Sequence, residues 1–307
     1  MTDALRFIPY AGIDQQKWDD RVAASANGFI FSQSFYLNAL CEWDALVAGD
    51  YEYIMALPRK KKAGFRYVFI PPFTGQLGII GHAKPGIGLC TAFIKAAARQ
   101  YAYTDSLLNE DNEAQEGKGI QVQWRDNMVL PLRDSYEMIA GRYSRDALKN
   151  LRKASLQGCT IEYNIPPEKV ITLYRAAYGR LNRKVSEQDY RKFYALALTA
   201  IQAKKGFTVG VNDAGSELVA GAFFGIDNKR LYYILGAPTP AGRQLKAVHY
   251  LVDTIIKKYA GTGLLFDFEG SDIESVANFY KKFSPLVRKY PHVKINRLPL
   301  LVRWLKK

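Results

Sequence analysis

Apolar and polar positions along the first half of the chain follow two patterns, one typical of helices and one of strands. Apolar residues spaced three and four apart form one buried stripe of a helix, whereas short alternating runs are typical of half-buried strands. The patterns predict one helix after Gly12, which carries Trp18, and others over residues 35–41 and 87–101. Strands are predicted at residues 5–9, 45–48, 51–57, 65–70 and 103–108. A polar loop at 109–119 follows the last of them.

The second half of the chain repeats this order of elements. Helices are predicted at residues 170–181, 190–201, 245–259 and 272–283. Strands are predicted at residues 207–211, 217–225, 230–235, 264–268 and 292–296. Each half therefore contains two helices, a strand, a hairpin, a helix and a strand, although no residue-level repeat is visible. This order predicts an α/β (α+β) chain of two units, each a mixed sheet flanked by helices, comprising residues 1–130 and 131–307 and joined near Pro131.

The segment between the halves is predicted to be one basic helix that begins after the N-cap Ser135 and extends to Ala154. Its cations recur at spacings that bring them to one face: Arg142, Arg145, Lys149, Arg152 and Lys153. Charged helix faces usually mix signs, but here Asp146 is the single acid. We interpret the face as one that contacts phosphates, with a passive solvated face as the alternative.

Composition limits the class of protein. The chain of 307 residues is 48% hydrophobic and 23% charged, as is normal for a globular protein. No apolar run approaches the roughly 18–20 residues that span a bilayer, and the first residues resemble no secretory signal. The three cysteines lie far apart without a Cys-x-x-Cys pair, which favours reduced thiols in a cytoplasmic protein. The three histidines form no ligand-like cluster, so we expect no metal.

The charge balance favours an anionic partner. The chain has 43 Lys and Arg against 29 Asp and Glu, a net charge of +14. Such an excess favours nucleic acid, a phosphorylated cofactor or anionic lipid headgroups, although it can also serve solubility alone. The sequence contains neither a Gly-x-Ser-x-Gly elbow nor a phosphate-binding Gly-x-x-x-x-Gly-Lys-Ser/Thr loop. Hydrolase and P-loop nucleotide chemistry are therefore not expected.

Residues 263–272 combine a predicted strand with acidic side chains at its end. Alternation places Asp267 and Glu269 on the same side of the strand. A glycine then allows a sharp turn, and Ser271 or Asp272 can cap the next helix. Carboxylates at the carboxyl end of a strand lie where open α/β sheets usually bind ligands. The alternative is a structural role, in which the two carboxylates form salt bridges or helix caps. This alternative weighs more for Asp267 than for Glu269.

Several segments resemble one family. Residues 266–271, followed by 276–283, resemble the C-terminal signature of the FemAB-type family. This family contains the peptidoglycan interpeptide-bridge aminoacyltransferases and their acetyltransferase-like relatives, which are made of two GNAT (N-acetyltransferase) folds. Residues 143–154 are similar to the segment that opens the family's second unit, and residues 58–62 and 72–78 are similar to a branch of uncharacterised relatives. The resemblance implies two tandem GNAT-like units with the reaction site in the second.

The resemblance also implies a donor-binding segment. Ordinary acetyltransferases bind the pyrophosphate of coenzyme A with an Arg/Gln-x-x-Gly-x-Gly/Ala loop, whose main-chain N–H groups precede a helix. The matching stretch here is 242–247, in which Arg243 or Gln244 and Ala247 fit but the middle glycines are absent. Arg243 and Lys246 would supply positive charge in their place. The resemblance implies an acyl-CoA donor, bound as a substrate and not as a prosthetic group, and the absent glycines are a departure from that pattern.

The implied catalytic residues lie close to the acidic segment. In many acetyltransferases a tyrosine protonates the leaving thiolate, and Phe279-Tyr280 stands at that place here. The bridge-forming aminoacyltransferases have a Phe-Lys pair there instead. We expect Glu269, directly or through a water, to accept the amine proton and Tyr280 to be the general acid, with Asp267 as a further candidate. The donor phosphates would be held by five cations: Arg145, Lys149, Arg152, Arg243 and Lys246.

These features predict a cytoplasmic acyltransferase that moves an acyl group from an acyl-CoA-type thioester to an amine acceptor. Two alternatives remain. An aminoacyl-tRNA-dependent transferase acting on a peptidoglycan precursor agrees with the basic excess, and a non-catalytic RNA-binding or anionic-ligand-binding protein agrees with the missing loop glycines. The sequence leaves open the acyl group, the acceptor and the oligomeric state.

Overall fold

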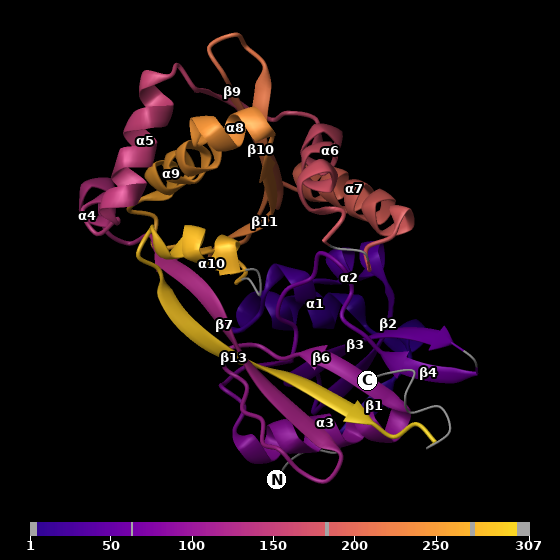
Figure 1. Cartoon of the computed structure of the whole chain (residues 1–307). Coiled ribbons are helices and arrows are strands. Elements are labelled where there is room, and N and C mark those ends of the chain that lie inside the picture. Colours follow the sequence, from indigo (N-terminus) through magenta and orange to yellow (C-terminus); the bar gives the residue numbers. More distant parts are fainter. Residues whose placement is uncertain (1–4, 63, 182–183, 271–273, 300–307) are drawn as a thin grey trace. The chain divides into compact units, whose positions relative to one another are not determined.

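The structure, a computed structural model, describes residues 5–62, 64–181, 184–270 and 274–299. Its internal contacts divide the chain into two compact units. Unit 1 comprises the chain up to Asp126 together with the segment from Lys289 onward, and unit 2 comprises Asn127–Arg288. Figure 1 shows the elements of each unit coloured along the sequence.

Unit 1 is a mixed sheet covered by helices on both faces. Its strands are β1 (Arg6–Ile8), β2 (Glu42–Ala48), β3 (Tyr53–Lys62), β4 (Phe65–Val68), β5 (Ile79–Gly81), β6 (Tyr103–Leu107), most of β13 (Leu286–Asn296) and, next to β13, the first part of β7 (Ile120–Pro131). Its helices are α1 (Gln15–Ala24), α2 (Ser34–Leu40), α3 (Ile87–Gln100) and the short turns η1 (Tyr10–Gly12) and η2 (Ile30–Ser32). The strand order is β1-β2-β3-β4-β6-β13, with β5 paired to β3. β4 pairs with β6 in parallel, whereas the pairs β1–β2, β2–β3, β3–β4, β3–β5 and β6–β13 are antiparallel.

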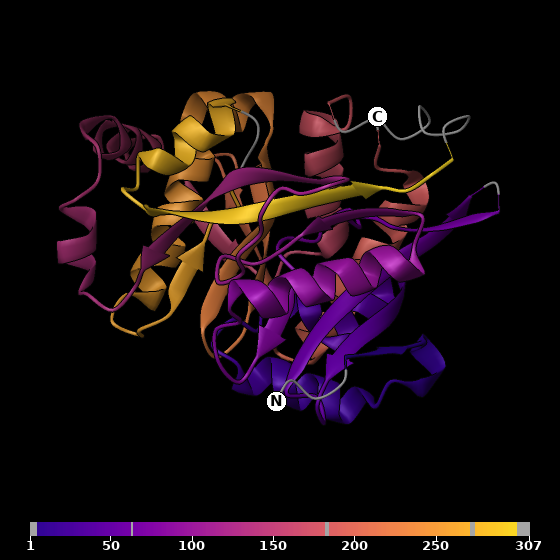
Figure 2. The ribbon, with the colours of Figure 1, turned by 90° about the horizontal axis from the view of Figure 1, so that it is seen from below.

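The two faces of the unit 1 sheet receive different helices because its strands alternate in side-chain direction. Leu46 and Met55 pack with Phe93 of α3 in one buried cluster. Figure 2 shows α3 lying across this face. The opposite face receives α1, whose Trp18 ring lies 4.8 Å from the ring of Trp43 on β2.

Unit 2 has the second mixed sheet. Its strands are β8 (Thr160–Tyr163), β9 (Gly206–Asn212), β10 (Leu218–Ile226), β11 (Arg230–Pro238), β12 (Leu265–Asp267) and the end of β7 (Ile120–Pro131). Its helices are α4 (Tyr136–Ala140), α5 (Arg145–Leu156), α6 (Pro167–Tyr178), α7 (Glu187–Gln202), α8 (Pro240–Leu245), α9 (Ala247–Tyr259) and α10 (Glu274–Lys281). The strand order is β7-β12-β11-β10-β9-β8. Figure 1 shows α5 and α9 on one side of β9–β11, and α6 and α7 on the other.

The helices lie on these two faces because each buries its apolar stripe there. The apolar stripe of α9 contributes Leu251, Val252 and Ile255 to a buried cluster that also contains Ala147 of α5. On the other face, the ring of Phe193 on α7 lies 5.5 Å from that of Phe223 on β10.

The two units share one strand order. In unit 1 the antiparallel run β2-β3-β4 is followed by α3 and by β6, which pairs parallel with β4. In unit 2 the antiparallel run β9-β10-β11 is followed by α9 and by β12, which pairs parallel with β11. A pair of helices precedes each run, α1 and α2 in one unit and α6 and α7 in the other. The predicted tandem of similar α/β units is confirmed.

Several expected boundaries differ from the observed ones. Strands β5, β7 and β8 were not predicted, and β3 continues to Lys62, beyond the strand that was expected at residues 51–57. The final strand, expected to end the second unit, pairs with β6 of unit 1 through residues 292–296. Unit 1 therefore takes in a segment that sequence order alone assigned to residues 131–307.

The expected single basic helix is two helices, α4 and α5. Each has its own N-cap, since Ser135 accepts from the Met138 amide and Ser144 accepts from the Ala147 amide at 3.1 Å. Arg142 lies between the two helices and pairs with Asp134 at 2.8 Å, so it leaves the predicted row of cations.

The expected helix at 245–259 is also divided. Lys246 has a left-handed backbone with φ of 63°, which ends α8 and begins α9.

Candidate active site

A fork in the unit 2 sheet defines the site. β11 pairs with β12 only over residues 230–232, and β12 ends at Asp267 while β11 continues to Pro238. On its other edge β11 pairs with β10, where Phe223 faces Leu235 but Phe224 faces Tyr233. Ile234 is therefore the extra residue of a β-bulge at the point where the two strands separate. Bulges bend a strand and redirect its backbone groups, and they are frequent beside active sites.

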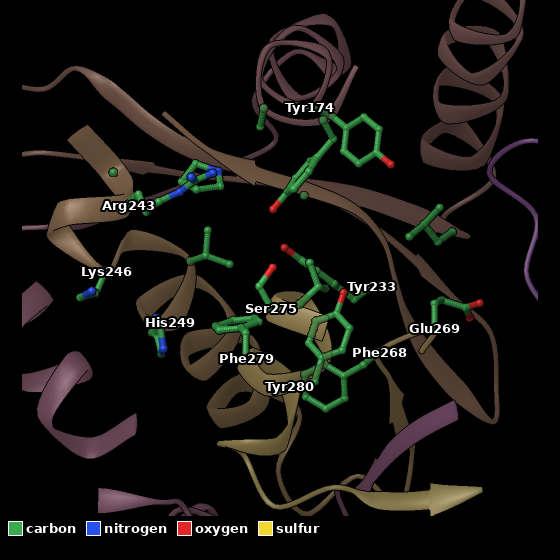
Figure 3. Close-up of a pocket in the computed structure, with 18 of the residues that line it drawn as sticks. Tyr174, Tyr233, Arg243, Lys246, His249, Phe268, Glu269, Ser275, Phe279 and Tyr280 are labelled. Atoms are coloured by element: carbon green, nitrogen blue, oxygen red, sulfur yellow. The ribbon is translucent and has the colours of Figure 1, made fainter. Parts of the chain in front are cut away.

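A cavity of about 570 Å³ lies at this fork. It is bounded by the free part of β11, by α6, by the α8–α9 junction, by the residues after β12 and by α10. Figure 3 shows Arg243, Lys246 and His249 toward one side of it and Glu269 toward the opposite side, with Tyr280 between them.

The cationic side is built by the α8–α9 junction. Thr239 caps α8 by accepting from the Gly242 amide at 3.0 Å. A Cβ on Gly242 would lie 2.0 Å from the Val219 carbonyl oxygen, so this glycine packs α8 directly against β10. The expected glycine loop is thus a short helix, followed by the left-handed Lys246 at the start of α9. Arg243 and Lys246 both line the cavity there.

Tyrosines form much of the cavity wall. Tyr174 and Tyr178 come from α6, Tyr233 from β11 and Tyr280 from α10. The rings of Tyr233 and Tyr280 lie 6.2 Å apart, edge to face. Burial raises the pKa of Tyr178, of Tyr233 and, well above its usual value, of Tyr280. Their hydroxyls therefore keep their protons near neutral pH and can donate hydrogen bonds.

The two acidic candidates have different surroundings. Asp267 is buried, pairs with Arg230 at 2.7 Å and accepts from Asn127 at 3.3 Å. Its other oxygen accepts from the Glu269 amide at 2.9 Å. Glu269 has a left-handed backbone with φ of 63°, so the expected alternation ends before it, and its side chain lines the cavity. The structure thus places Glu269 at the cavity and Asp267 beneath it; Ser271 and Asp272 lie outside the described residues.

The sequence did not single out His249 as a site residue, although it lines the cavity. It accepts a hydrogen bond at Nε2 from the Asn150 side chain at 3.2 Å, and its ring lies edge-on to Phe279 at 4.7 Å. Burial, with smaller contributions from Lys282 and Lys246, lowers its pKa to about 4 against an opposing effect of Asp146. The imidazole is therefore neutral at neutral pH. The available signal in the sequence was its position in the first turn of α9, next to the cationic junction.

The remaining predicted donor-binding residues are not brought to the cavity wall. Gln244 is exposed on α8, and Ala247 is buried as the first residue of α9. Arg145, Lys149 and Arg152 are exposed on α5 and are not among the residues that line the cavity.

Within the described residues, no three His, Cys, Asp or Glu side chains gather as a metal site would require. Nor does any helix there have the length and apolar character needed to cross a bilayer. Cys41, Cys90 and Cys159 are each buried and unbridged.

Residues 143–282, which lie within unit 2, match the family model of the acetyltransferase (GNAT) domain. The protein is therefore an acyl-transferring enzyme. A search of curated protein sequences gave no match.

Solved structures show the same fold across both units. FemX aligns with a TM-score of 0.68 at 12% identity, over 96% of this chain and 99% of FemX. The C-terminal domain of a putative lysylphosphatidylglycerol synthetase from Agrobacterium fabrum aligns with a TM-score of 0.57 at 12% identity, over 95% of this chain and 94% of the domain. L-PGS from Bacillus licheniformis gives 0.53 at 14% identity, with 95% of each chain covered. The chain is thus two tandem GNAT-like units, each a mixed sheet flanked by helices.

Proposed function

We propose that the unit 2 cavity transfers an acyl group from an acyl-CoA-type thioester to an amine acceptor. The supporting observation is the order of groups along the fork: Arg243 and Lys246 at one side, Tyr280 in the middle and Glu269 at the other side. A donor with phosphates at one end and a thioester at the other matches this order, because its phosphates would meet the cations and its thioester would meet Tyr280 and Glu269.

The donor's phosphates would lie at the α8–α9 junction. The N-terminus of α9 carries partial positive charge and unsatisfied N–H groups, which suit an anion. Arg243 and Lys246 supply positive charge at this junction, in place of the absent loop glycines. The extended thioester arm, which carries amides, would lie along the free part of β11, where strand-like backbone pairing is available.

The acceptor amine would attack the thioester carbonyl from the Glu269 side. A carbon–nitrogen bond forms and the carbon–sulfur bond breaks. Glu269, directly or through a water, takes the proton released by the amine. Backbone N–H groups at the Ile234 bulge would stabilise the carbonyl oxygen as negative charge develops on it. Tyr280, which burial keeps protonated, gives its proton to the departing thiolate.

The residue roles are tested by measuring thiol release from acetyl-CoA with a panel of amines. We expect Glu269→Gln and Tyr280→Phe each to lower kcat by about 10²–10⁴-fold, as for the loss of a general base or acid. Matched controls are Glu274→Gln, at an exposed position on α10, and Tyr163→Phe, at an exposed position on β8. Near-normal rates in both test variants would overturn the assignment.

An aminoacyl-tRNA donor with a peptidoglycan precursor as acceptor is the second candidate, favoured by the net charge of +14. Titrating coenzyme A, acetyl-CoA and bulk tRNA at two salt concentrations separates the two. Saturable thioester binding that weakens in Arg243→Gln and Lys246→Gln, but not in the exposed control Lys169→Gln, supports the first. Salt-sensitive tRNA binding accompanied by aminoacyl transfer supports the second.

We also propose that the protein works in the cytoplasm. The support is its three unbridged cysteines, which suit a reducing compartment.

A further inference from the structure

Helix α5 carries a mixed basic and apolar surface, which we call the α5 outer face. Its members are Arg145, Leu148, Lys149, Arg152, Lys153 and Leu156. Leu148 is 46% exposed and Leu156 is 81% exposed. Leu148 lies within α5 and Leu156 is its last residue, so the helix carries two exposed leucines among its cations. It is their combination with the cations in one surface patch that is informative.

The geometry of the helix places these residues together. α5 buries Ala147, Asn150 and Ala154 on the side that faces α9. At about 100° per residue, the direction opposite to these three falls between Arg152 and Arg145, with Leu156 and Leu148 on either side of it. The two leucines are eight positions apart and thus about 12 Å apart along the helix axis. Cations lie between and beside them, so the leucines and cations form one stripe.

The cations of this stripe have no internal role in the fold. No ion-pair partner is found for Arg145, Lys149, Arg152 or Lys153 in the part of the chain that the structure describes. Asp146, the single acid of α5, lies at the border of the face and pairs with Lys282 at 2.5 Å. The charged side chains of the α5 outer face are therefore all cationic.

We infer that the α5 outer face docks on an anionic lipid bilayer surface. Lys and Arg are attracted to acidic headgroups, while leucines between them enter the boundary between headgroups and acyl chains. Long basic side chains also suit that boundary, because their stems are apolar and their heads reach the phosphates. A nucleic-acid backbone would satisfy the cations but would give the leucines no apolar partner, so the leucines favour the lipid. This inference rests on α5 and is independent of the chemistry proposed for the cavity.

The test is co-sedimentation of the full chain with vesicles of phosphatidylcholine alone or mixed with phosphatidylglycerol. We expect binding to the anionic vesicles and little binding to the neutral ones. Leu148→Ser combined with Leu156→Ser should weaken binding about tenfold or more. Lys149→Gln combined with Arg152→Gln should weaken it about 25-fold, at about fivefold for each cation.

Matched controls come from α7, where Leu198 and Arg191 are also exposed. Leu198→Ser and Arg191→Gln should bind vesicles as the unchanged protein does. Failure to bind anionic vesicles would overturn the inference. So would binding that depends on the two cations but ignores both leucines, especially if bulk tRNA competes for it, since that pattern would identify a nucleic-acid surface. Urea unfolding of each variant separates lost docking from lost folding.

Discussion

The neutral, half-buried His249 makes the stability of unit 2 sensitive to acid. In the folded protein its pKa is lowered to about 4, with burial as the main cause. An unfolded chain returns the imidazole to its ordinary pKa of about 6.5. Between these values the unfolded state binds more protons than the folded state, so the free energy of unfolding falls as the pH falls.

The size of the effect follows from the shift. With a pKa of about 4 in the folded state, His249 lowers the free energy of unfolding by about 3 kcal/mol at most, and this full loss is reached only below pH 4. At pH 5 the loss is about 2 kcal/mol, and at pH 7 it is close to zero. The charged groups that bear on the ring are Lys246, Lys282 and Asp146, and Asn150 is its neutral hydrogen-bond donor.

Urea unfolding at pH 7 and pH 5 measures this effect in the unchanged protein and in His249→Gln. Glutamine retains an acceptor for Asn150 but cannot titrate. On moving from pH 7 to pH 5, the unchanged protein should lose about 2 kcal/mol more than the variant. Other groups, including Asp253, whose pKa burial raises, contribute equally to both and cancel. His82→Gln, at an exposed histidine in unit 1, controls for the loss of an imidazole. Equal pH dependence in the unchanged protein and His249→Gln would refute the reasoning.

Two further predictions concern the parts that support the cavity. Arg230→Met leaves the buried Asp267 carboxylate without its cation and should lower the free energy of unfolding by about 3–5 kcal/mol; a loss below about 1 kcal/mol in chemical denaturation would contradict this role. Gly242→Ala should destabilise unit 2 and weaken donor binding, because its Cβ would collide with the Val219 carbonyl. Gly88→Ala in α3 is the control, since its Cβ meets no atom within 4 Å and should be neutral or stabilising. If calorimetry and donor titration show Gly242→Ala and Gly88→Ala to be equivalent, the packing argument fails.

Much of the fold was accessible from the sequence because most helices bury one continuous stripe. The stripe of α9 was visible as an apolar pattern, and the short apolar runs of β9–β11, separated by polar turns, predicted the central hairpins. The strands that were missed lack such a pattern. β8 is mostly exposed and β7 alternates only partly before its buried end, so neither differs from a polar loop in sequence alone.

The sequence did not reveal that the basic helix divides, because it offers two alternative N-caps. Both Ser135 and Ser144 can cap a helix, and the apolar spacing continues across the interval between them. Only tertiary contact decides the outcome: the Ser144 amide donates to the Lys282 carbonyl, and Ser284 donates to the Arg142 carbonyl. A sequence pattern contains no information on contacts with residues more than a hundred positions away.

The candidate site was predicted in outline. The acidic segment and the following helix led to Glu269 and Tyr280, and the donor segment led to Arg243 and Lys246, all of which line one cavity. Burial explains what was missed. Asp267 and Glu269 are two positions apart, yet one is buried against Arg230 and the other turns toward the cavity. His249 became recognisable only when the fold placed it beside the cationic junction.

The left-handed backbones of Lys246 and Glu269 have a consequence for how selection acts at these two positions. Each costs about 1–2 kcal/mol relative to an ordinary conformation, a cost that glycine would largely remove. A sequence selected for stability alone would therefore favour glycine at both positions. Instead the chain keeps a cation at one side of the cavity and an anion at the other, each on a backbone shape that disfavours it. In variant libraries scored separately for folding and for turnover, we expect the substitutions at these two positions that score best for folding to score worst for turnover.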